Sequence, residues 1–191
     1  MCIFGKKDNS SKETVKVESP AANTSANSAT FRFDYLPKTL ADMQALPEAS
    51  MDTPFKTAAL TVCALCAYGE DRSAGLEMLN WLRGPYQQPM SQGEIQFLND
   101  RFRDGQKYVA YSYFNGAKPE NEYTPSAPFT ITITANQYSY QDGGYCNLWL
   151  RSGGADSPRN IKMRRANDVW YLLEQCVMVG IRQPKSQNPW G

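Results

Sequence analysis

The amino-acid sequence of 191 residues contains no histidine. This absence excludes Ser-His-Asp and Cys-His catalytic arrangements, metal sites with a histidine ligand, and the side chain that most often acts as a general base near neutral pH. No apolar run approaches the ~18 uninterrupted residues that a membrane-spanning helix needs. We therefore expect no integral membrane association.

The chain also has no large excess of either charge, because it contains 20 Lys and Arg residues and 19 Asp and Glu residues. A chain with a net charge of +1 lacks the broad positive field that draws proteins to nucleic acid. Nucleic acid is therefore not an expected partner. The length is typical of one domain with an appendage.

Cysteine is present in an odd number, and most of the five thiols lie among apolar residues. This pattern favours reduced, buried thiols in a cytoplasmic protein over a disulfide framework. Cys63 and Cys66 form a C-x-x-C pair, but they lie in the middle of a predicted helix, where burial raises the thiol pKa. We predict that the pair packs in the core, and we expect neither a metal nor a cofactor. The other thiols are Cys2, Cys146 and Cys176.

Residues 1–30 contain few large apolar side chains. From residue 8 to residue 30, Val15 and Val17 are the only branched apolar residues. Such a segment cannot bury enough surface to offset its ordering entropy, so we predict a disordered arm over residues 1–30 and a single folded domain over residues 31–191. A weak membrane contact through Ile3 and Phe4 is an alternative role for residues 1–7.

The first half of the predicted domain has helical periodicity. Caps at Thr39, Thr53 and Ser91 begin three of four expected helices, and Glu94 completes a capping box with Ser91. In the last helix, Glu94 belongs to a face that we expect to be solvated. The expected helices cover residues 39–46, 53–68, 73–83 and 91–105.

The second half alternates with the period of strands. In residues 129–134, Phe129, Ile131 and Ile133 alternate with threonines, and residues 145–151, 159–165 and 169–174 continue the strand pattern, with a turn at residues 167–168. Residues 108–114 are expected to form a short strand or an ordered loop. Helices followed by strands predict an α+β fold, with four helices on an antiparallel meander of four to five strands. The sheet could curve around a pocket, as in cystatin-like or NTF2-like cones.

Several stretches of the chain resemble a functionally uncharacterised family of small bacterial cytosolic proteins, a domain of unknown function. The most specific stretch is RSGGADSPR at residues 151–159, and the resemblance extends from about residue 36 to residue 190. It implies the same domain boundaries and fold, and it implies no activity. Cys146 and Cys176 depart from the family pattern, which argues against a cysteine-based role. Other resembling stretches are residues 46–49, 55–68, 112–117 and 170–175.

Residues 151–159 are also the best candidate site. Backbone N–H groups at Gly153 and Gly154 could form an anion-binding nest, and Arg151 and Arg159 could pair with a carboxylate or phosphate. The alternative is that this stretch is ordinary turn chemistry, with Asp156 neutralised by an arginine. The complete set of candidates is Arg151, Gly153, Gly154, Asp156, Arg159 and Trp149.

Aromatic residues make up 12% of the chain and gather in its strand-rich half. Tyrosine and tryptophan are enriched at interfaces, although they also stabilise sheets. We therefore predict a non-enzymatic binding or interaction module with an unidentified protein partner or a small anionic ligand. The alternatives are a pocket for a small anionic molecule and a histidine-free enzyme, and no residue is predicted to be catalytic.

Overall fold

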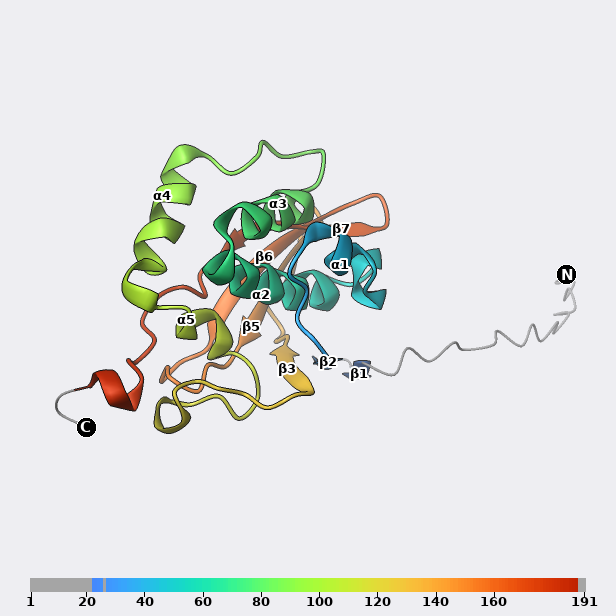
Figure 1. Cartoon of the computed structure of the whole chain (residues 1–191). Coiled ribbons are helices and arrows are strands. Elements are labelled where there is room, and N and C mark those ends of the chain that lie inside the picture. Colours follow the sequence, from blue (N-terminus) through green and yellow to red (C-terminus); the bar gives the residue numbers. More distant parts are fainter. Residues whose placement is uncertain (1–21, 26, 189–191) are drawn as a thin grey trace, which may run out of the picture.

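An antiparallel sheet forms one layer of the protein, and helices cover one of its faces (Figure 1). The computed structural model describes residues 22–25 and 27–188. The strands follow the order β1-β2-β3-β5-β6-β7, and β4 pairs with β5. Their bounds are β1 Ala22–Ser25, β2 Ser28–Phe33, β3 Phe129–Thr134, β4 Tyr140–Gln141, β5 Tyr145–Leu150, β6 Arg159–Ala166 and β7 Val169–Gln175.

Alternating burial places one face of the sheet against the helices. Ile131 and Ile133 of β3 are fully buried, whereas Thr130 and Thr132 are only half-buried on the opposite face. The same alternation is present in β5, where Leu148 lies opposite Ile161 of β6 and both are inaccessible to solvent. The α+β class and the antiparallel sheet predicted from the sequence are therefore confirmed.

Helix α2 is the centre of the core. All residues from 57 to 68 are buried, because α2 contacts α3, α5 and most strands of the sheet. This explains why its sequence is apolar nearly all round. No helix in the described part of the chain combines the length and apolar character needed to cross a membrane. The helices are α1 Leu40–Gln44, α2 Pro54–Glu70, α3 Arg72–Arg83, α4 Gln92–Arg101 and α5 Tyr108–Tyr111.

The N-terminal boundary differs from the prediction. Strand β2 begins at Ser28, within the predicted disordered arm, and Ala22–Ser25 pairs with it. Ala29 is 1% exposed, and the Thr30 hydroxyl lies 3.0 Å from that of Thr132. Backbone pairing with β3 stabilises this segment. The prediction was based on the apolar content of residues 1–30, which gives no information about such pairing. Residues 1–21, including the predicted membrane contact of residues 1–7, lie outside the described residues.

Residues 108–111 form helix α5 rather than the predicted strand or loop. Tyr108, Val109 and Ala110 are buried, and α5 packs against α2. Tertiary packing therefore overrides the strand preference of aromatic and β-branched residues. Strands β1, β2 and β4 were likewise not among the predicted strands.

Candidate functional site

The N–H groups of Gly153 and Gly154, which were predicted to form an anion-binding nest, donate hydrogen bonds to other groups of the protein. The Gly153 N–H donates to the Ser112 carbonyl oxygen at 2.9 Å, and the Gly154 N–H donates to the Ser152 Oγ at 3.0 Å. The Ser152 and Ser112 hydroxyls are in turn hydrogen-bonded at 2.8 Å. These contacts dock the loop on the segment that follows α5, so turn chemistry accounts for the glycine pair.

Arg159 binds the C-terminal segment of the chain. Its Nε donates to the Val179 carbonyl at 2.9 Å, and its Nη2 donates to the Gly180 carbonyl at 3.0 Å. Asp156 is paired with an arginine as predicted, but the partner is Arg182, at 3.1 Å. Arg159 therefore has a structural role here, and the predicted pairing of Arg151 and Arg159 with one anion stays a prediction.

The two remaining candidates lie apart from these contacts. Arg151 is exposed and makes no ion pair within the described residues. Trp149 is on the helix-free face of β5, opposite Asn160 of β6, and its buried Nε1 has no hydrogen-bond partner among the described residues. Of the predicted set, Gly153 alone lines a described hollow, of about 770 Å³, together with Lys118, Arg182 and Lys185.

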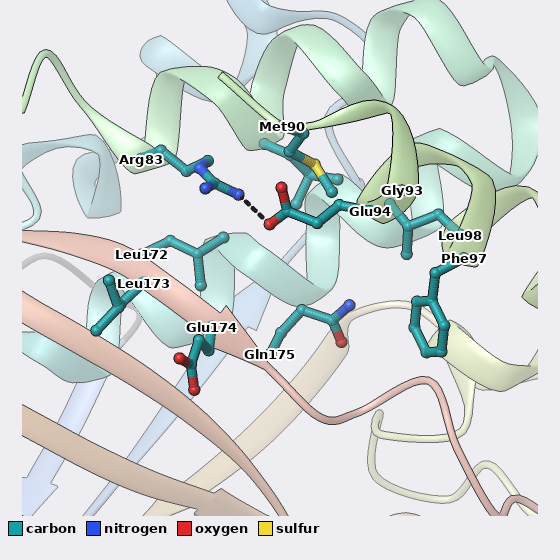
Figure 2. A pocket seen from close by; sticks show the side chains of 11 residues that line it. Arg83, Met90, Gly93, Glu94, Phe97, Leu98, Leu172, Leu173, Glu174 and Gln175 are labelled. Atoms are coloured by element: carbon teal, nitrogen blue, oxygen red, sulfur yellow. Dashed lines mark hydrogen bonds and ion pairs between the residues drawn. The ribbon is translucent and has the colours of Figure 1, made fainter. Parts of the chain in front are cut away.

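A second cavity, of about 290 Å³, lies between the helices α3 and α4 and the strand β7 (Figure 2). We call it the α4–β7 groove. Its polar groups come from Arg83, Glu94, Glu174 and Gln175. Its apolar lining comes from both the helices and the strand, and consists mainly of Leu79, Met90, Phe97, Leu98, Leu172 and Leu173.

Glu94 positions α4 over the groove. Its carboxylate accepts the Ser91 N–H at 2.8 Å, which caps α4, and it accepts Nη1 of Arg83 at 2.6 Å, which ties α4 to the end of α3. Burial raises the pKa of Glu94, but the hydrogen bonds from Arg83 and Ser91 outweigh burial and hold the pKa below its ordinary value. The carboxylate is therefore ionised at neutral pH. Glu94 was predicted to lie on a solvated face, but its side chain is only partly exposed and forms an ion pair with Arg83.

Arg83 lines the groove and carries one buried donor without a partner among the described residues. Its side chain is 14% exposed, and its Nε is buried without a partner in the described part of the chain. Leaving a buried donor unpaired costs about 1–3 kcal/mol. Figure 2 shows Arg83 and Glu94 pointing toward each other on the helical side, with Leu172 and Glu174 coming from β7.

Strand β7 is the last strand in the path of the sheet. On its outer side, the Trp170 N–H donates to the Met51 carbonyl at 2.9 Å, and the Leu172 carbonyl accepts Nε2 of Gln87 at 2.7 Å. Leu173 has no partner on β6, because the register shifts there. Beyond Leu172, no strand within the described residues pairs with this edge.

The sequence contained one signal for this groove, the capping box at Ser91 and Glu94. It did not identify Arg83 as the second partner of Glu94. The two residues are 11 positions apart and belong to different helices, and their proximity depends on the path of the intervening loop.

The buried thiols lead to a labelling prediction. Cys63 and Cys66 are at most 2% exposed, burial raises both of their pKa values, and burial raises the pKa of Cys146 to about 12. Cys176 is exposed. In the native protein, iodoacetamide should therefore alkylate Cys176 at least roughly a hundredfold faster than these three thiols.

Peptide mapping by mass spectrometry measures these rates, and the control is the unfolded protein, in which Cys63, Cys66, Cys146 and Cys176 should all react. Labelling of Cys63 as fast as that of Cys176 would contradict core packing.

The described residues contain no group of three or more Cys, Asp or Glu side chains placed to hold a metal ion.

Comparison with known proteins adds a family. No curated protein and no solved structure matches the chain. The sequence model of a domain of unknown function, DUF6935, matches residues 35–185, which include α1 to α5, strands β3 to β7 and the whole lining of the α4–β7 groove. The resemblance to an uncharacterised family is thereby confirmed, and the chain belongs to the DUF6935 family.

Proposed function

We propose that this protein is a binding module that takes an extended peptide segment into the α4–β7 groove. One observation carries the proposal: a cavity with a largely apolar lining lies beside β7, the last strand in the path of the sheet. A peptide main chain supplies the strand that this edge lacks. Addition of a strand to a sheet edge is a recurrent mode of peptide recognition.

The size of the groove fits a side chain better than a large ligand. Its volume of about 290 Å³ is at the lower end for small-molecule sites. Leu79, Leu98 and Leu172 provide an apolar surface on which one aliphatic or aromatic side chain of the peptide can pack. The peptide backbone would bind the edge, and this side chain would provide specificity.

The charge at the groove favours a basic peptide. The charge of Glu94 is balanced by Arg83, but Glu174 is exposed and makes no ion pair within the described residues. Its cross-strand neighbour Lys162 lies 5.3 Å from the centre of the Tyr145 ring. Complementarity therefore favours lysine or arginine next to the apolar anchor.

The test uses an acetylated peptide of alternating leucine and threonine with a lysine at each end. Its matched control is the same peptide with N-methylated backbone amides, which cannot donate to β7. We expect the unmodified peptide to bind the full chain and the methylated peptide to bind at least about tenfold more weakly. Fluorescence anisotropy measures both affinities.

Two variants locate the site. Phe97 lines the groove and is 37% exposed, so Phe97→Ser should weaken peptide binding about tenfold without unfolding the protein. Tyr138, which is 73% exposed and does not line the groove, provides the matched control Tyr138→Ser. Absence of peptide binding, or equal losses in the two variants, would refute the proposal.

Two finer features also belong to the proposal. The sheet would curve around α2 as in a cystatin-like or NTF2-like cone, which is supported by the contacts of α2 with β2, β3, β5, β6 and β7. A cytoplasmic location is supported by the free thiols of Cys63, Cys66 and Cys146.

A further inference from the structure

We propose that a second site, separate from the α4–β7 groove, binds a small molecule that carries a diphosphate group. The site is the hollow lined by Lys118, Gly153, Arg182 and Lys185, which we call the basic hollow. It shares no lining residue with the groove, so either proposal can fail without the other. It is also a different arrangement from the predicted nest, of which it retains only Gly153.

The walls of the basic hollow are fastened to one another. The Arg182 N–H donates to the Gly154 carbonyl at 2.9 Å, and the Tyr123 hydroxyl donates to the Arg182 carbonyl at 2.8 Å. The Ser186 N–H donates to the Glu122 carboxylate at 3.0 Å. Three segments that are distant in the sequence thus have fixed relative positions. Such preorganisation lowers the entropic cost of binding.

The cations of the basic hollow are available to a ligand. Lys118 and Lys185 are exposed and make no ion pair in the described part of the chain. Arg182 is paired with Asp156, but the side chains are 62% and 92% exposed, and such surface pairs contribute little. A phosphate can therefore compete with Asp156 for the guanidinium.

One carboxylate lines the hollow together with the three cations, and two more are bound to Arg182 and Ser186 beside it. Glu120 also lines the hollow, whereas the two carboxylate oxygens of Glu122 accept hydrogen bonds from the Ser186 N–H and hydroxyl. The lining itself therefore holds three cations, Lys118, Arg182 and Lys185, and a single carboxylate, whereas a count that adds Asp156 and Glu122 is balanced. A ligand with more than one negative charge gains most from cations on separate walls.

The volume and polarity of the hollow indicate the class of ligand. About 770 Å³ is more than a single phosphate ion fills, and it lies within the range of small-molecule sites. Lysine, arginine, glutamine and asparagine side chains line it, so an apolar molecule would find little surface to bury. A diphosphate with a polar remainder fits both properties.

The experiment titrates the full chain with inorganic pyrophosphate and follows binding by isothermal calorimetry at low ionic strength. We expect saturable binding by the wild type, and binding at least about tenfold weaker in the double variant Lys118→Gln/Lys185→Gln. Lys38 is exposed and does not line the hollow, so Lys38→Gln should bind like the wild type. Raising the salt to about 0.5 M should weaken binding because these charges are screened.

Three results would overturn the proposal. One is the absence of saturable binding to pyrophosphate, and another is equal affinity in the wild type and the double variant while thermal melting shows both folded. The third is binding to vesicles that contain phosphatidic acid without binding to pyrophosphate, which would assign the cations to a membrane surface.

Discussion

Gly75→Ala should lower the free energy of unfolding by about 3 kcal/mol. Gly75 lies in α3, where a Cβ atom would stand 2.2 Å from the Cα and 2.3 Å from the backbone N of Tyr68 in α2. These neighbours belong to the backbone of a buried helix, so they cannot rotate away. The methyl group can be accommodated only if α3 moves away from α2.

At an ordinary position in a helix, replacing glycine by alanine has the opposite effect on the free energy of unfolding. In an open helical position, alanine is favoured over glycine by up to ~1 kcal/mol. Gly93 in α4 is the matched control, because no atom of the described residues lies within 4 Å of a Cβ built there. Gly93→Ala should therefore leave stability unchanged or slightly increased.

Urea unfolding followed by circular dichroism compares the two variants. A Gly75→Ala midpoint equal to that of Gly93→Ala would show that α3 is not held against α2 as described. The point matters for the groove, because Arg83 is the last residue of α3 and its distance from Glu94 depends on the position of this helix.

Local signals were sufficient to predict much of the fold. The caps at Thr39, Thr53 and Ser91 begin helices in the structure, because each side chain accepts a nearby backbone N–H. The alternation of Ile131 and Ile133 with threonines predicted β3 correctly, because period two is a direct consequence of strand geometry.

Pairing between distant segments could not be predicted in the same way. Residues 28–30 contain no large apolar side chain, and they form a strand because they pair with β3, about a hundred positions later. Helix α5 depends equally on the buried surface of α2. In both cases the stabilising partner is remote, and the segment itself carries no matching pattern.

For the candidate sites, too, local sequence signals were informative and contacts between distant segments could not be predicted. Glycine pairs are needed both where amides bind an anion and where two backbones approach closely. Residues 151–159 gave no way to distinguish these roles, because Ser112 and Ala117, the neighbours that decide, precede them by more than thirty positions. The basic hollow could not be predicted from the sequence for a related reason, because Lys118 and Lys185 come from separate ends of the strand-rich half.

Gly153→Ala tests the close approach directly and should also cost about 3 kcal/mol. A Cβ at Gly153 would stand 1.8 Å from the Ala117 carbonyl oxygen and 2.9 Å from its carbonyl carbon. The backbone of Gly153 is not in the left-handed region, so conformational strain adds nothing to this cost. The loop would have to withdraw, and the hydrogen bond from the Gly153 N–H to Ser112 would lengthen or break.

Gly116→Ala separates close contact from backbone strain. Gly116 has a φ of +85°, but none of the described residues has an atom within 4 Å of a Cβ built there. Its replacement should cost only about 1 kcal/mol, from the left-handed backbone alone. Urea unfolding of both variants gives the comparison, and amide hydrogen exchange at position 153 reports whether the loop has detached. If Gly153→Ala were no more destabilising than Gly116→Ala, the loop would not be docked on Ala117, and its amides would again be available to an anion.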